Sequence, residues 1–126
     1  MSLMDKLAFN DQGLIPAIIT NAEDGRPLTL CYLNREALEK TLETGKVHVF
    51  RRSAGRLMLK GETSGHIQEV KRVLLDCEGK SLLIEVKQHV AGCHQGYMSC
   101  YFREYDVKRG EIRIVEKQIF NPEKVY

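Results

Sequence analysis

Three cysteines and a histidine in the second half of the chain are the residue types of a zinc site. Cys77 precedes Cys93 by 16 residues, Cys100 follows Cys93 by seven, and His94 stands directly beside Cys93. Three thiolates would leave the fourth tetrahedral position of a zinc ion open, which is typical of catalytic sites. Water would fill that position, and a neutral His94 could take its proton or pass one to a leaving nitrogen.

Cys93 and Cys100 can reach one zinc ion only if the chain between them folds back. Seven extended residues span roughly 23 Å, whereas two thiolates on one zinc lie within roughly 4 Å of each other. Gly92 and Gly96 allow such a return, and Tyr97–Phe102 has the composition of a strand that carries Cys100 inward. The spacing matches no short zinc pattern such as paired CxxC, so a packed strand end stays an alternative.

Two other stretches contain residues that suit a phosphate. KGETSGH has two glycines around hydroxyl side chains, and it can turn backbone amides toward an anion while its lysine supplies charge. RRS offers arginine, whose fork fits phosphate. The alternative is a plain hairpin turn for KGETSGH, which the residues alone favour, and a solvated turn for RRS. The candidate substrate-binding residues are Arg51, Ser53, Lys60, Glu62, Thr63 and Ser64.

Two carboxylates flank the first cysteine of the zinc pattern. In an extended segment Asp76 and Glu78 would point to one side and Cys77 to the other. That arrangement could hold a hard cation such as magnesium on one face and zinc on the opposite face. A plain acidic turn is the alternative.

The composition of the whole chain limits its compartment and partners. The 126 residues suit one domain, residues 1–126, and the net charge of +2 is scattered, which argues against nucleic-acid binding. No apolar run is long enough for a membrane span, and the first residues lack the pattern of a signal peptide. We therefore expect a cytoplasmic protein with reduced thiols, in which disulfides are the weaker interpretation.

The remaining pattern predicts a mainly β (α+β) fold, a compact β-rich domain with one main helix. A hairpin is expected over residues 15–33, and a helix over residues 35–44, capped by Asn34 and ended by Gly45. Strands follow at 46–50, 56–60, 66–76, 81–89 and within 111–120, and the last six residues read as an extended tail. Cys31, inside LTLCYL, is predicted to be a buried small hydrophobe without chemistry.

Taken together, the stretches GETSGHIQ, LDCEGKSLLIEV and GCHQGYMSCYFR resemble the phosphoribosyl-AMP cyclohydrolase family of histidine biosynthesis. The likeness extends from IPAII through CYLNREALEKTLETGKVH to FNPEKVY, and so covers nearly the whole chain. It implies an intertwined homodimer, with a small-molecule nucleotide as substrate and zinc at the subunit interface.

The resemblance also implies a role for each residue of the cysteine pattern. Cys77 of one subunit would share a zinc ion with Cys93 and Cys100 of the other, and His94 matches the histidine implicated in catalysis. The family reaction opens the adenine ring by hydrolysis between N1 and C6. It requires a nucleophilic water, whose pKa the metal lowers toward roughly 7.

The chain departs from the family at two places near the implied site. The family's acidic motif, Asp-Cys-Asp-x-Asp, is taken to hold magnesium, but here Glu78 and Lys80 replace two of its aspartates, so one carboxylate is lengthened and another becomes an amine. The family also usually has tryptophans where this chain has Phe50 and Met58. Two alternatives therefore stay open: a zinc hydrolase of the same fold for another purine nucleotide or amidine, and a non-catalytic nucleotide-binding dimer with structural zinc.

Overall fold

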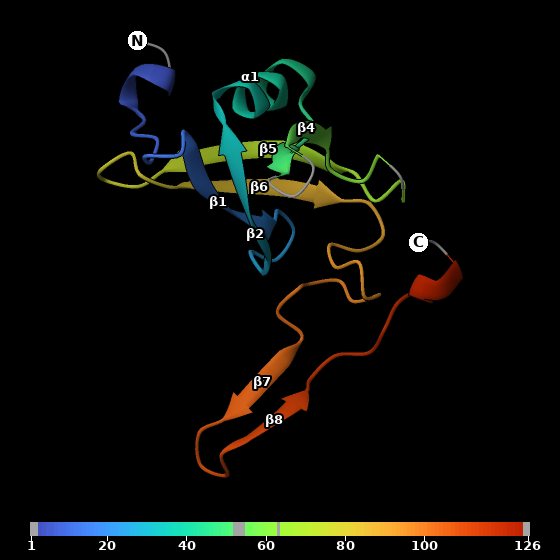
Figure 1. Cartoon of the computed structure of the whole chain (residues 1–126). Coiled ribbons are helices and arrows are strands. Elements are labelled where there is room, and N and C mark those ends of the chain that lie inside the picture. Colours follow the sequence, from blue (N-terminus) through green and yellow to red (C-terminus); the bar gives the residue numbers. More distant parts are fainter. Residues whose placement is uncertain (1–2, 52–54, 63, 125–126) are drawn as a thin grey trace.

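The computed structural model describes residues 3–51, 55–62 and 64–124, so the candidate contacts Ser53 and Thr63 lie outside the described residues. After a short 3-10 helix (Leu3–Lys6), the main sheet has the strand order β2 (Pro27–Asn34), β1 (Leu14–Asn21), β6 (Leu82–Gln88) and β5 (Gln68–Leu75). The pair β1–β6 is parallel, and the other two pairs are antiparallel. The predicted first hairpin is confirmed as β1–β2 (Figure 1).

Helix α1 (Arg35–Thr44) begins and ends where the sequence predicts. The side chain of Asn34 accepts a hydrogen bond from the backbone N–H of Ala37 at 2.8 Å, and Gly45 closes the helix with a φ of 74°. Ala37 and Leu38 are fully buried in the core. Because the described part of the chain has this one α-helix among eight strands, the predicted mainly β (α+β) fold is confirmed.

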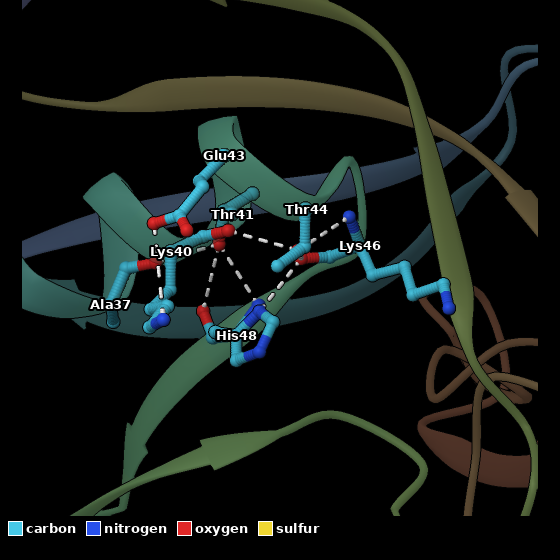
Figure 2. A network of polar contacts seen from close by, with 7 residues as sticks. All are labelled: Ala37, Lys40, Thr41, Glu43, Thr44, Lys46 and His48. Atoms are coloured by element: carbon cyan, nitrogen blue, oxygen red, sulfur yellow. Dashed lines mark hydrogen bonds and ion pairs between the residues drawn. The ribbon is translucent and has the colours of Figure 1, made fainter.

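A buried threonine joins the helix to the small sheet beside it. The hydroxyl of Thr41 donates to the carbonyl of Ala37 at 2.8 Å and accepts from the backbone N–H of His48 at 2.9 Å (Figure 2). His48 starts strand β3 (His48–Arg51), which pairs with β4 (Arg56–Leu59) in antiparallel register. The helix end therefore fixes the position of a strand that carries Phe50 and Arg51.

The core lies between the main sheet and α1. Leucine, isoleucine, valine and alanine side chains fill it, because alternate residues of the half-buried strands point to the same face. Its buried members are Ile15, Ala17, Ile19, Leu28, Leu33, Ala37, Leu38, Val47, Leu82, Ile84 and Val86.

The C-terminal part of the chain departs from the sequence prediction in three places. Strand β7 (Arg103–Asp106) was not predicted, and it pairs with β8 (Glu111–Ile114) in a hairpin that projects from the body of the molecule (Figure 1). Residues 97–102 contain no strand, with bends at 98–100 and irregular structure at the other positions, so the strand predicted there is wrong. The predicted extended tail is also wrong at Pro122–Lys124, which is a short 3-10 helix.

No described helix has the length and apolar character that crossing a membrane requires.

Candidate functional site

The segment after β6, residues 91–102, folds back on itself and is called the cysteine loop below. The backbone N–H of Gly92 donates to the carbonyl of Met98 at 2.8 Å, and the backbone N–H of Cys93 donates to the backbone carbonyl of Tyr97 at 3.1 Å. A Cβ at Gly92 would lie 2.7 Å from the Met98 carbonyl, and Gly96 has a φ of 97°. The prediction that the chain needs glycine at positions 92 and 96 to fold back is therefore confirmed.

The hydrogen bonds of Ser99 explain why residues 97–102 leave a straight strand path. The hydroxyl of Ser99, which is fully buried, donates to the carbonyl of Pro27 at 2.7 Å and accepts from the backbone N–H of Tyr101 at 2.9 Å. The N–H of Cys100 donates to the carbonyl of Leu28 at 2.6 Å. Single bonds of this kind tie the loop to β2 in place of a regular ladder.

The fold-back brings two of the predicted zinc ligands together. The side chains of Cys93 and Cys100 are neighbours across the fold-back, and the Cys100 sulfur lies 3.9 Å from the carbonyl oxygen of Gly92. Burial, together with the neighbouring Cys100, raises the pKa of Cys93, while the backbone N–H of Gln95, 3.4 Å from its sulfur, acts in the opposite direction. Two adjacent thiols supported by a backbone N–H are a donor set that fits half of a tetrahedral zinc site.

The third predicted ligand lies at the other end of the sheet. Cys77 is exposed in the turn that precedes β6, whereas the cysteine loop follows β6 (Figure 1). Seven strand residues span roughly 23 Å, far more than two thiolates on one metal allow. Among the described residues, no three histidine, cysteine or acidic side chains of one chain gather in a metal-binding group.

A cavity of about 700 Å³ opens beside the cysteine loop. Its walls come from β2, the β3–β4 pair, the segment after β4 and the cysteine loop itself. Of the candidate residues, Arg51, Lys60, Glu62, Ser64, His94 and Cys100 line it. Phe50 and Met58, at the positions of the family's tryptophans, also line it. The structure thus gathers the described substrate-binding candidates around one space.

Two cavity residues were missed from the sequence. Cys31 was predicted to be a buried small hydrophobe without chemistry, but it is half-buried and lines this cavity. Desolvation there raises the pKa of its thiol to about 11 despite the nearby Lys60 ammonium. His66 is buried at the cavity wall, edge-on to Phe120 with ring centroids 4.7 Å apart, and burial lowers its pKa. The alternation of side chains along the strand LTLCYL could have indicated that Cys31 faces the cavity. No local sequence signal indicates that His66 lies at the cavity wall.

A second cavity, of about 690 Å³, lies between the cysteine loop and the C-terminal segment. The rings of Tyr97 and Phe102, stacked 3.8 Å apart, form part of its wall. His94 lines both cavities, so its imidazole lies where the cysteine loop separates the two spaces.

The acidic segment has a different conformation from the predicted one. Cys77 and Glu78 form a turn, so the prediction that Asp76 and Glu78 share one face of an extended segment is wrong. The Asp76 carboxylate accepts hydrogen bonds from the Ser81 hydroxyl and from the N–H groups of Lys80 and Glu78. These bonds, above all the one from Ser81, hold the pKa of Asp76 below its usual range.

Comparison with known proteins identifies the family. The sequence pattern of the phosphoribosyl-AMP cyclohydrolase family matches residues 29–102, which include most of β2, the cavity segments and the cysteine loop. The chain belongs to the phosphoribosyl-AMP cyclohydrolase family. It is thereby an enzyme, a hydrolase of the cyclohydrolase class.

Relatives in this cyclohydrolase family align along nearly the whole chain. The phosphoribosyl-AMP cyclohydrolase of Pelotomaculum thermopropionicum is 48% identical over 124 residues, 98% of this chain and 95% of that protein. That of Chlorobium phaeovibrioides is 45% identical over 125 residues, 99% of this chain and 90% of that protein. A histidine biosynthesis bifunctional protein of Thermoanaerobacter pseudethanolicus is 42% identical over 125 residues, 99% of this chain and 57% of its own greater length.

Proposed function

We propose that this chain is a zinc-dependent phosphoribosyl-AMP cyclohydrolase of histidine biosynthesis, which opens the adenine ring by hydrolysis between N1 and C6. One observation carries the proposal. The neighbouring side chains of Cys93 and Cys100 lie beside a cavity of about 700 Å³, which Cys100 and His94 line. Family membership over nearly the full length supports the same substrate.

Zinc is the metal that this donor set suits best. Cys93 and Cys100 would supply two thiolates and Cys77 of the partner subunit the third, leaving one position for a water molecule. When bound, the metal acts as a Lewis acid that lowers the pKa of that water to about 7. The N–H of Gln95, 3.4 Å from the Cys93 sulfur, stabilises the thiolate form that metal binding requires.

The chain's own residues bind the nucleotide and move the protons. His94 lies beside Cys93 and lines the cavity, so its imidazole can accept a proton from the attacking water and deliver one to N1 of the opening ring. Lys60 and Arg51 supply positive charge for the phosphate, with Ser64 as a hydroxyl donor. Phe50 and Met58 offer apolar surface to the purine.

The separation of Cys77 from the cysteine loop supports a homodimer, since one chain does not complete the zinc site. The projecting hairpin supports it as well. Tyr105 pairs with Ile112 on one face of the β7–β8 hairpin, and Ile114 lies on the same face. These three side chains are 58–67% exposed, while the other face has the Glu104–Arg113 ion pair at 2.8 Å. An isolated hairpin with one apolar face needs a covering surface.

The main sheet offers a second apolar surface on the side away from its core residues. Leu30, Ile18, Leu83 and Leu74 are successive register partners across β2, β1, β6 and β5. Leu30, Ile18 and Leu74 are exposed in the single chain. Such a row, together with the hairpin, is exposed apolar surface that a second copy of the chain would cover in the proposed homodimer. The cytoplasm, where thiols stay reduced, is the compartment that suits this site.

The test is turnover of phosphoribosyl-AMP by zinc-loaded protein, followed by ultraviolet absorbance. Replacing His94 with Ala should lower the turnover number by about 10²- to 10⁴-fold while the protein stays folded and zinc-bound. His48→Ala is the matched control, because His48 belongs to the helix contact of Figure 2 and does not line the cavity. A folded, zinc-replete protein without turnover would favour another purine nucleotide as substrate, and full activity in His94→Ala would reject its catalytic role.

A further inference from the structure

The acidic turn between β5 and β6 uses its first carboxylate to hold its own shape. Both oxygens of Asp76 are engaged: Oδ1 accepts the N–H groups of Lys80 at 2.9 Å and Glu78 at 3.1 Å, and Oδ2 accepts the Ser81 hydroxyl at 2.6 Å. The backbone bond from Gly79 to the carbonyl of Asp76, 3.2 Å long, closes the same turn. A cation bound by Asp76 would have to displace bonds that fix the turn.

The second carboxylate of the turn already has a cationic partner. The ammonium of Lys80 lies 3.1 Å from Oε2 of Glu78, and both side chains are exposed. Magnesium binds oxygen ligands at about 2.0–2.1 Å in a near-ideal octahedron and is repelled by an ammonium at this range. The lysine also stands where the family's motif has a third carboxylate, so the turn loses one ligand and gains a positive charge.

We propose that this acidic turn binds no divalent cation and that Lys80 supplies the positive charge locally. The enzyme then works with zinc alone. The dependence on zinc alone rests on the proposed function. The absence of a divalent cation at the turn does not, because cation binding is measured without turnover.

The binding experiment uses zinc-replete protein and Mn²⁺ as a paramagnetic probe for magnesium, read by electron paramagnetic resonance. Wild-type protein should bind no Mn²⁺ that Mg²⁺ displaces. Lys80→Asp restores the carboxylate and removes the ammonium, so it should gain a site for one Mn²⁺ per chain that Mg²⁺ displaces. Lys71→Asp, the same charge change at an exposed position of β5, should behave as wild type.

Mg²⁺-displaceable binding of one Mn²⁺ per wild-type chain, unchanged in Lys80→Asp, would overturn the proposal. In the kinetic arm, removing Mg²⁺ from zinc-loaded wild-type protein should leave the turnover of phosphoribosyl-AMP unchanged, and a large loss would also overturn it. If no protein turns over the substrate under any condition, the proposed function fails while the Mn²⁺ measurement still decides the cation question.

Discussion

The hydroxyl of Ser99 donates a hydrogen bond to the carbonyl of Pro27, with 2.7 Å between the two oxygens, and so fastens the cysteine loop to the start of β2. Replacing Ser99 with Ala removes a fully buried donor and should lower the free energy of unfolding by about 1–2 kcal/mol. It should also weaken zinc binding, because Cys100 follows directly. Chemical denaturation and competition with a zinc chelator measure the two effects.

The control for this variant is Ile84→Val, which should destabilise the core of the sheet by about 0.5–1.5 kcal/mol without touching the loop. Equal zinc affinities in the two variants would contradict a specific role of Ser99 in holding the loop.

A second prediction concerns the crowded glycine of the cysteine loop. At Gly96 the φ is 97° and an added Cβ would lie 2.5 Å from the Phe120 carbonyl, whereas Gly13 has a φ of 74° with open space around it. Gly13→Ala should therefore lower the free energy of unfolding by about 1–2 kcal/mol through backbone strain alone. Gly96→Ala should lower it further and reduce zinc affinity. If thermal denaturation gave both variants the same loss, the close approach to Phe120 would not matter.

A third prediction follows from the position of Cys77. Cys77→Ser and Cys93→Ser should each be inactive, since each lacks one ligand of every site. A heterodimer of the two retains one complete set: Cys77 from one chain with Cys93 and Cys100 from the other. After random subunit exchange, turnover should recover to about a quarter of the wild-type value. No recovery in a mixture that mass spectrometry shows to contain heterodimers would place all the ligands in one chain.

The buried imidazole of His66 gives a pH-dependent prediction. Burial lowers the pKa of His66 below 6.5, its value in the unfolded chain, so the unfolded state binds more protons as the pH falls below about 6.5. Stability is lost across that range, and His66→Gln should flatten the dependence between about pH 7.5 and 5.5. The other three histidines are present in both proteins. Urea unfolding at each pH gives the slopes, and equal slopes would count against a buried neutral His66.

The sequence predicts well the parts of the fold that local chemistry decides. Asn34 and Gly45 mark the ends of α1 because a cap needs only the neighbouring backbone. Strand β7 was missed because REYD is polar, and its apolar face becomes visible only when Tyr105 is paired with Ile112 of β8. Residues 97–102 have strand composition, yet the bond from Ser99 to Pro27, distant in sequence, decides their path.

The candidate site likewise has residues that the local sequence predicts and residues that only the folded structure reveals. Local residue types indicated Cys93, Cys100 and His94, and the structure makes the two cysteine side chains neighbours. The strand predicted over residues 81–89 lies between Cys77 and Cys93, so the sequence already indicated that these two cysteines flank opposite ends of β6. It could not reveal His66, whose proximity to the cavity comes from packing against Phe120 in the C-terminal segment.

We propose that zinc held by Cys93 and Cys100 serves catalysis. The most direct measurement strips the metal with a chelator, restores zinc alone, and follows phosphoribosyl-AMP turnover together with the oligomeric state. We predict a folded dimeric apoprotein without turnover, and recovery of activity in proportion to zinc bound. An apoprotein that keeps its activity, or one that unfolds or dissociates because the zinc is structural, would contradict the account.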